Sequence, residues 1–327
     1  MATLDWTETE ALAYLGAMKA VALAHEPAEL TAIDRAMLRA TAEHVLQIDA
    51  DPDTVATVDA EALAEAVPDA KKRGQALEFL ILMPYLQGEV DPHRVAEVDR
   101  YAAALGVHRD TLTSLHQVRD DRMKRLQFDY FRRSMHTDLF PGDGMLAKIR
   151  TAAEAFHQFR GDAKVAERYA AYASFEKGTL GRTFADFYRD RNFPLPGEKG
   201  SFSEFIVPHD LSHILGGFNT DMAGEMDVAG MEAGMAKTPF GYELLLEVIL
   251  DFHLGLPFTT MGLLKPGKGN FHPDSVMRGF EIGARMSIDL MSGWDWHADM
   301  DQPVPRLRER YGIEGVTGIE IPPPVAN

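Results

Sequence analysis

Apolar residues in the first 132 positions recur with the period of an α-helix. The run A-L-E-F-L-I-L-M, which starts at Ala76, echoes an earlier run, A-L-A-Y-L-G-A-M, which starts at Ala11. Each run is followed by a short polar turn, at 25–29 and at 87–92, and then by another amphipathic stretch. The pattern predicts two similar helix pairs, as in a duplicated helical bundle, joined by an acidic linker at 49–69.

The second half of the chain keeps the helical period, but glycine and proline interrupt it. The strongest boundary signal is Pro141-Gly142-Asp143-Gly144. Apolar spacing predicts helices on either side of later Gly/Pro loops, over residues 145–173, 182–191, 240–254 and 275–291. A strand pattern is confined to 318–321. The predicted fold class is all-α with two helical domains, residues 1–140 and residues 141–327.

Three stretches of the second half invite more than one interpretation. The continuous apolar run at 240–254 favours a central core helix over a helix that lines an apolar cavity. His253 at its end could approach a site, although the spacing does not require it. The segment 126–140 mixes aromatic residues with arginines, as a patch for nucleic acid or lipid headgroups would. The overall acidity of the chain favours a seam between the domains. Lys265 and Lys268, in a long Gly/Pro loop, could bind an anionic group. The simpler interpretation is that both lysines are exposed to solvent.

Composition narrows the class of protein. The chain has 327 residues, 46% hydrophobic and 25% charged, which is typical of a globular protein with room for two sizeable cores. A formal net charge of -17 disfavours nucleic-acid binding through a general field. The absence of cysteine excludes disulfides, thiolate metal sites and cysteine nucleophiles. With no basic-then-apolar leader and no apolar run of about 20 residues, we expect a cytoplasmic protein.

The residues with the clearest chemistry lie between positions 207 and 235. In a helix, His209, Asp210 and His213 fall within an arc of about 100°, so three potential ligands face the same way. Glu225 follows twelve residues after His213, on a second predicted helix that begins after a short turn. Two imidazoles and two carboxylates at this spacing suit a divalent metal, Zn²⁺ most readily, with Mg²⁺ or Fe as alternatives. A helix-surface hydrogen bond and a core histidine are the simpler explanations.

The whole pattern, H-D-x-x-H followed by eleven residues and a glutamate, resembles the signature of the Coq-four family of ubiquinone-biosynthesis proteins. Two further segments resemble that family: K-G-T-L-G-R at 177–182, and W-D-W at 294–296 followed by P-V-P-R-L-R-E-R-Y-G-I at 303–313. The similarity covers residues 142–314, more than half of the chain. Pro208 departs from it, since a continuing helix is expected there.

This resemblance implies an activity and a set of site residues. It implies action on a polyprenylated benzoate head group, with loss of the ring C1 carboxylate coupled to hydroxylation. His209, Asp210, His213 and Glu225 are the implied metal ligands, and Asp210 and Glu225 the implied catalytic carboxylates. Asp210 could instead orient an imidazole, and Asp221 is the substitute ligand. The implied partners are a prenylated quinone precursor or isoprenoid lipid, other quinone-biosynthesis proteins, the inner membrane face and a second copy of the chain.

The first half resembles a different family, the TerB-like proteins of tellurite resistance. The segment Q-G-E-V-D-P-H-R-V-A-E-V-D-R-Y-A-A-A-L-G-V at 87–107 carries this resemblance. In that family the turn often begins with aspartate and can bind metal, but Gln87 stands in its place here. We therefore expect Glu89 and Asp91 to serve as first-turn charges that favour a helix dipole.

Two other classes of function fit the same residues. One is a non-catalytic scaffold that binds a prenyl lipid and gathers quinone-biosynthesis enzymes, with a closed, structural metal site. The other is a metal phosphohydrolase, because His-Asp pairs also occur in an unrelated helical class of such enzymes. A hydrolase would require further dispersed histidine and aspartate ligands. An enzyme, in contrast to a scaffold, should keep one coordination position open.

Overall fold

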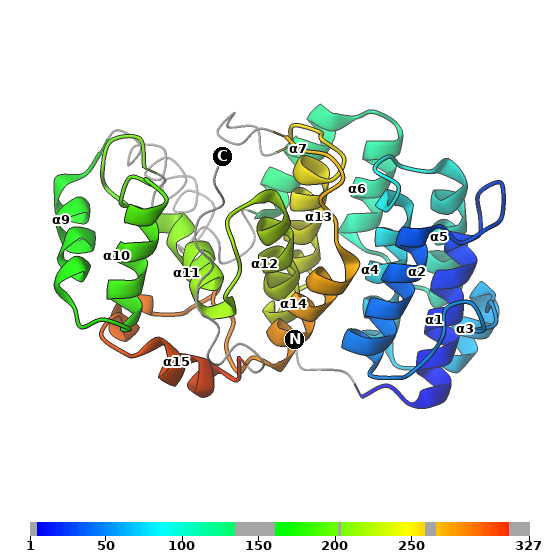
Figure 1. The fold of residues 1–327 in the computed structure, drawn as a ribbon. Coiled ribbons are helices and arrows are strands. Elements are labelled where there is room, and N and C mark those ends of the chain that lie inside the picture. Colours follow the sequence, from blue (N-terminus) through cyan, green and yellow to red (C-terminus); the bar gives the residue numbers. More distant parts are fainter. Residues whose placement is uncertain (1–4, 135–160, 202–203, 259–265, 314–327) are drawn as a thin grey trace.

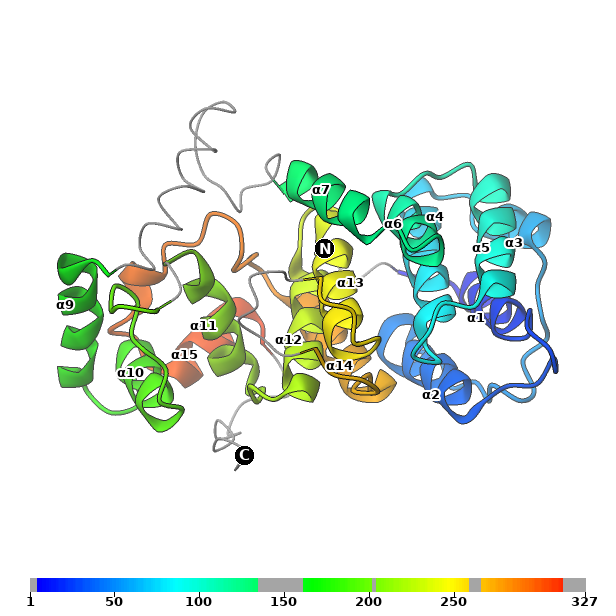
Figure 2. The same ribbon diagram turned by 90° about the horizontal axis from the view of Figure 1, so that it is seen from above.

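The structure is a computed structural model that describes residues 5–134, 161–201, 204–258 and 266–313. Every named element in these ranges is a helix, so the predicted all-α fold is confirmed. Figures 1 and 2 show three groups of helices along the molecule: the N-terminal helices at one end, α12 to α14 in the middle, and α9 to α11 with α15 at the other end. None of the described helices is long and apolar enough to cross a membrane.

The first half contains the two predicted helix pairs. α1 (Glu8–Ala22) is followed by α2 (Ala32–Ala40), and α4 (Ala70–Leu82) is followed by α5 (Pro92–Leu105). The predicted linker is not wholly irregular, because it holds a further helix, α3 (Ala60–Ala66). The remaining elements are a π-helix after α2 and a 3-10 turn after α4, then two more helices: η1 (Thr41–Leu46), η2 (Met83–Tyr85), α6 (Asp110–Arg119) and α7 (Met123–Ser134).

A buried ion pair joins the two helix pairs. Arg94 of α5 donates through both terminal nitrogens to the carboxylate of Asp34 on α2, at 2.7 and 2.8 Å, and both side chains are fully buried. Asp91, one residue before α5, accepts hydrogen bonds from the backbone amides of His93 and Arg94. Asp91 is therefore the N-cap of α5 and places its charge at the helix start, while Glu89 lies before the helix, so neither is a first-turn residue as predicted.

The second half is also helical throughout the residues that the structure describes. Its α-helices are α9 (Ala163–Ala171), α10 (Leu180–Asp190), α11 (Val207–Gly216), α12 (Met222–Met235), α13 (Phe240–Phe252), α14 (Pro273–Arg285) and α15 (Val304–Tyr311). Short 3-10 turns connect them: η3 (Tyr172–Ser174), η4 (Glu204–Ile206) and η5 (Trp296–Asp299). Predicted helix positions at 145–160 and the strand pattern at 318–321 lie outside the described residues.

Helix α12 lies between two hydrophobic cores. Met226, Ala229 and Ala233 belong to a core formed with the N-terminal helices, α13 and α14. Val228 and Met231 belong instead to a core formed with α9, α10, α11 and α15. A helix that is apolar on opposite faces is stable only when it is covered on both, and α12 meets that condition. The two cores therefore place α12, and any polar side chain on it, at the centre of the molecule.

The first of these cores extends across the predicted domain boundary at residue 140. It contains residues of α1 and α4 together with Leu245 and Leu250 of α13, which confirms α13 as a core helix. The Gly/Pro segment 141–144 lies outside the described residues, so the division into two domains stays a prediction. What the described residues show is a continuous apolar packing between the N-terminal helices and α12 to α14.

Helices α12 and α14 meet backbone to backbone through glycines. A Cβ atom at Gly283 of α14 would lie 2.0 Å from the carbonyl oxygen of Met231, and one at Gly230 of α12 would lie 2.3 Å from that of Val276. Gly234 and Gly279 are equally close to the opposite helix. Each glycine costs helix propensity, about 1 kcal/mol relative to alanine. The close approach of the two helices accounts for their presence inside helices.

Buried polar pairs line the seam between the N-terminal helices and α13. Thr111 donates to Glu78 at 2.6 Å, and Arg133 donates to Glu243 at 2.6 Å and to Ser114 at 2.9 Å. Burial raises the pKa of Glu78 from its ordinary value of 4.5 to about 8, against the lowering effects of Thr111 and a nearby guanidinium. Burial likewise raises the pKa of Glu243, to about 7.

The predicted seam at 126–140 is only partly a contact surface. Tyr130 of α7 packs its ring against Phe258, with centroids 5.1 Å apart, and Arg133 reaches α13. Phe128 and Phe131 instead face outward, with 67% and 51% of their surface exposed. Alternation along α7 explains the difference, because only one face of a surface helix can pack against its neighbour. Residues 135–140 of this segment lie outside the described residues.

We predict that Gly283→Ala destabilises the protein by about 3 kcal/mol, because the added methyl group would overlap the backbone of α12. In an open helix the same substitution would stabilise by about 1 kcal/mol, so the expected sign is opposite to that of helix propensity. Urea unfolding of both proteins checks this. Equal or greater stability of the variant would show that α12 and α14 are not in close contact.

We predict that Glu78→Gln flattens the pH dependence of stability. The folded-state pKa of Glu78 is raised from 4.5 to about 8, so its contribution is fully present below pH 4.5 and is lost as pH rises through 8. One proton corresponds to a slope of about 1.4 kcal/mol per pH unit in this window. Urea unfolding at pH 5, 7 and 9 measures the slope, with exposed Glu65→Gln as the control. Parallel slopes for all three proteins would contradict the prediction.

Candidate metal centre

Helices α11 and α12 bring the predicted ligands together. α11 has Pro208 in its first turn, where the missing amide hydrogen is no loss, so the departure from the Coq-four pattern there does not break the helix. It ends at Gly217, which adopts φ +71°, a conformation that glycine reaches without strain. Asp221 then caps α12 by accepting a hydrogen bond from the amide of Gly224 at 2.8 Å. The tight return places the first turns of α12 beside α11.

Three of the four predicted ligands converge. His209 Nε2 lies 3.3 Å from His213 Nε2 and 3.1 Å from Glu225 Oε2, and His213 Nε2 lies 3.5 Å from Glu225 Oε1. Two ligands of a tetrahedral Zn²⁺ ion, each at about 2.0–2.1 Å, are separated by about 3.3 Å. The separation of the two nitrogens fits that value, and each nitrogen lies at a similar distance from one of the two Glu225 oxygens. Three protein ligands in such a set would leave a fourth position for water or substrate.

A further carboxylate fixes the orientation of one imidazole. Glu232 Oε1 lies 2.9 Å from His209 Nδ1. An ionised carboxylate only accepts hydrogen bonds, so Nδ1 donates to Glu232, and Nε2, which faces His213 and Glu225, is the nitrogen that would bind a metal in place of its proton. A carboxylate on the distal nitrogen of a metal-binding histidine is a common supporting interaction, because it sets the tautomer and raises the basicity of the ligand.

The charges of the group stabilise one another. Burial alone would lower the pKa of His209, but the carboxylates of Glu232 and Glu225 outweigh it and raise that pKa well above its ordinary value. Burial alone would raise the pKa of Glu225, but the imidazoles of His213 and His209 outweigh it and hold that pKa below the usual range. Nδ1 of His213 is buried and has no hydrogen-bond partner among the described residues. The donor set is therefore anionic and imidazole-rich, as divalent metals of intermediate hardness prefer.

The fourth predicted ligand, Asp210, and the substitute ligand, Asp221, do not belong to this group. Asp210 accepts a hydrogen bond from the hydroxyl of Tyr188 on α10, and burial raises the pKa of Asp210. The ligand atoms that lie within 4.8 Å of one another come from His209, His213 and Glu225. Asp221 is occupied as the cap of α12. Metal ligation by Asp210 stays a prediction, and the contact with Tyr188 suits the alternative role of an orienting residue.

Two other features that the sequence singled out lie elsewhere. His253 is buried near the N-terminal helices, where Nε2 lies 3.1 Å from the carbonyl oxygen of Leu86 and Nδ1 accepts a hydrogen bond from the amide of Phe271 at 3.4 Å. Its two ring nitrogens are thus used in packing α13 rather than in the triad. Lys265 lies outside the described residues, and Lys268 belongs to the loop beside α13.

Sequence reasoning missed Glu232. The signal was available, because Glu232 stands seven residues after Glu225 and therefore on the same face of a helix. A second group, formed by Glu43, His44 and Asp274, also brings potential ligand atoms together. Its two carboxylates are exposed, and hydrogen bonds to Glu281 at 2.8 Å and Asp274 at 3.4 Å account for both ring nitrogens of His44. The triad on α11 and α12 is the better candidate.

Comparisons with known proteins add little to this geometry. No family model matches the chain, and no curated protein matches it. A solved structure with some similarity is that of a protein from Nostoc punctiforme that is proposed to act in ubiquinone biosynthesis, at 17% sequence identity and a TM-score of 0.32. The match covers 75% of this chain and 99% of the Nostoc chain. Similarity of that degree indicates neither the fold nor the function of this chain. The TerB-like resemblance of the first half stays a prediction.

We predict that Glu232→Gln lowers the affinity for Zn²⁺ by about 10- to 100-fold, the usual effect of losing such a supporting carboxylate. The substituted amide can still accept from His209 Nδ1 but no longer carries the charge that raises the basicity of the ring. Competition with a chromophoric chelator measures the change. Asp227→Asn is the matched control, since it removes one carboxylate from the same helix at a side chain that bonds Ser275 instead. Equal losses in both variants would contradict a specific role for Glu232.

Proposed function

We propose that this chain is a divalent-metal protein of quinone biosynthesis that removes the C1 carboxylate of a polyprenylated benzoate head group. The observation that carries the proposal is the convergence of two imidazole Nε2 atoms and one carboxylate at separations of 3.1 to 3.5 Å. The family-like segments at 177–182 and 294–313 supply the substrate class. Zn²⁺ is the metal that such a donor set suits best.

The residues of the site have separate tasks in this proposal. When bound, the metal supplies Lewis-acid binding of the substrate carboxylate and stabilisation of negative charge. His209 and His213 would bind the metal through Nε2, with the metal in place of any proton there, and Glu225 would offer an anionic oxygen that offsets the metal charge. Glu232 holds His209 in the tautomer that points Nε2 inward. Asp210, hydrogen-bonded to Tyr188, fixes α10 beside α11 and so acts as a positioning residue.

Loss of the carboxylate as CO₂ leaves an electron pair on ring carbon C1, which must take up a proton or react with an oxidant. The coupled hydroxylation that the family resemblance implies requires an oxidant such as dioxygen as a second reactant. A prenyl tail would anchor the substrate in a membrane, so the proposal includes contact between a cytoplasmic protein and the inner membrane face. It includes no nucleic-acid partner.

A scaffold with a structural metal is the second candidate. The observation that favours it is the position of the triad, which ties α11 in one core to α12 between both cores. A metal bound there would hold the two cores together whether or not it reacts. Two measurements distinguish these candidates. Removal of the metal by a chelator should lower the stability of a scaffold, whereas substitution of Glu225 should lower the turnover of an enzyme.

We predict that the purified chain contains about one metal ion per chain and releases CO₂ from a carboxyl-labelled prenylated 4-hydroxybenzoate. His213→Ala should lose both the metal and the activity, because it removes one of the two imidazoles of the triad. Glu225→Gln should lose at least 100-fold in activity while its melting temperature stays within a few degrees of the wild type. Metal analysis gives the metal content and release of labelled CO₂ gives the activity. Mass spectrometry identifies any lipid that co-purifies.

The control is Asp227→Asn, which changes the same helix away from the triad and should keep metal and activity. A wild-type protein that is prepared without chelators and contains neither metal nor prenyl lipid would contradict the proposal. A metal that stabilises the fold strongly, with no CO₂ release, would identify the scaffold instead. Phosphate release from simple esters would identify a phosphohydrolase.

A further inference from the structure

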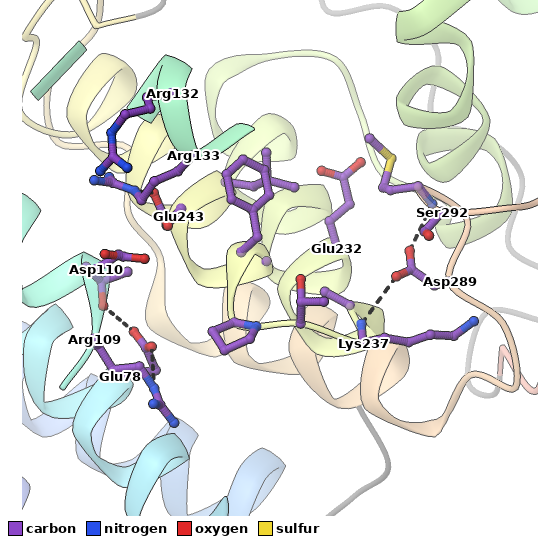
Figure 3. Close-up of a pocket in the computed structure, with 18 of the residues that line it drawn as sticks. Glu78, Arg109, Asp110, Arg132, Arg133, Glu232, Lys237, Glu243, Asp289 and Ser292 are labelled. Atoms are coloured by element: carbon purple, nitrogen blue, oxygen red, sulfur yellow. Dashed lines mark hydrogen bonds and ion pairs between the residues drawn. The ribbon is translucent and has the colours of Figure 1, made fainter. Parts of the chain in front are cut away.

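A cavity of about 710 Å³ lies between the two halves of the chain, and Glu232 is one of the residues that line it. Its walls come from the start of α6, the end of α7, the connection between α12 and α13, and the segment 289–292. Figure 3 shows Arg109, Arg132 and Arg133 from the N-terminal half on one side, and Glu232 with Asp289 on the other. This cavity is built from elements that the metal centre does not use, apart from Glu232.

Three arginines gather at one end of the cavity in a protein whose net charge is -17. Arg132 is more than half exposed, and it lies 3.9 Å from the carboxylate of Asp129. Arg133 and Arg109 contact Glu243 and Glu78, at 2.6 and 3.1 Å. Both of these glutamates are buried, and burial raises the pKa of each toward or above neutrality. This end of the cavity therefore favours a negative ligand at neutral pH.

Two helices also begin at this cavity. α6 starts after Arg109 and α13 starts after Pro239, and neither N-cap residue makes a side-chain capping hydrogen bond. Most helices of the N-terminal half are capped by aspartate or threonine: Thr7, Thr31, Asp59, Asp69 and Asp91. The positive ends of two helix dipoles thus add to the arginines.

The remaining wall is apolar. Pro239, Phe240, Leu244 and Met291 line the cavity as well. The other carboxylates there already have donors: Asp289 accepts from the amides of Lys237 and Met291, and Glu232 from His209. Asp110 is the exposed exception at the arginine end. A ligand that complements both the arginines and the apolar residues of the cavity has a negative group at one end and an apolar body.

We propose that this cavity binds an organic anion, with a carboxylate or phosphate group against Arg132 and Arg133 and an apolar body along Pro239 and Phe240. The site is separate from the metal triad and needs no metal. The two sites share Glu232, which is among the residues that line the cavity and whose carboxylate contacts His209. The same cavity joins the N-terminal helices to the metal-bearing half, so the ligand would contact both.

The test is isothermal titration of the full chain, as purified, with benzoate, phenyl phosphate, inorganic phosphate and neutral benzamide. At least one aromatic anion should bind ten or more times as tightly as benzamide and as inorganic phosphate, and the affinity should fall as salt rises. The stronger of benzoate and phenyl phosphate identifies the anionic group. Equal binding of benzamide would overturn the anion site, and equal binding of inorganic phosphate would overturn the role of the apolar wall.

Variants locate the binding. Arg132→Glu should weaken the preferred anion at least tenfold, and Asp110→Asn should strengthen it two- to threefold by removing a nearby negative charge. Arg122→Glu is the matched control, because Arg122 has the same charge and similar exposure, 57% against 55%, but does not line the cavity. Unchanged binding in Arg132→Glu, or an equal loss in Arg122→Glu, would overturn the proposal.

His213→Ala separates this inference from the proposed function. The variant lacks an imidazole of the triad but keeps every residue that lines the cavity. Retained binding supports the cavity site even if the chain proves to have no decarboxylase activity. Loss of binding in this variant, with Arg132→Glu unaffected, would mean that the anion sits at the triad and would overturn the inference.

Discussion

The close contact between α12 and α14 is the constraint on which the rest of the structure depends. Glycines on both helices let the two backbones touch, so α12 is held at a fixed depth and rotation. With that position set, one face of α12 completes the core of the N-terminal helices and another completes the core around α10 and α11. Glu225 and Glu232 project from the narrow sector that remains. The geometry of the metal centre is thus set by packing that involves no metal ligand.

Polar groups are concentrated where the apolar cores stop. The triad occupies the edge of one core, and the arginine-lined cavity occupies the seam of the other, with Glu232 between them. Each buried charge in this region has a partner that offsets the cost of losing water, as His209 does with Glu225 and Glu232. Such an arrangement costs stability that an apolar interior would not, which is the usual signature of a site kept for binding or chemistry.

Much of this arrangement could be predicted from the sequence. The part that could not be predicted depends on contacts between helices that are distant in the chain. Helical spacing and the proline and glycine signals predicted α11, the return turn, the shared orientation of His209, Asp210 and His213, and the position of Glu225 on the following helix. Spacing alone could not separate Asp210 from that group, because an arc of about 100° on one helix leaves open which side chains a neighbouring helix meets. The structure adds a contact of Asp210 with Tyr188, 22 residues earlier in the chain, which the spacing within one helix could not indicate. The arginine-lined cavity could not be predicted either, because its walls come from segments that are far apart in the sequence.

The glycine contact has a consequence for how this sequence can change over time. At Gly230, Gly234, Gly279 and Gly283 any side chain would push α12 away from α14. A change at one of these positions would then be felt at Glu225 and Glu232, although none of the glycines touches the metal centre. Selection for the site therefore acts on four residues with no chemistry of their own. In relatives that keep the triad these positions should drift slowly, while exposed positions such as Phe128 remain free to vary.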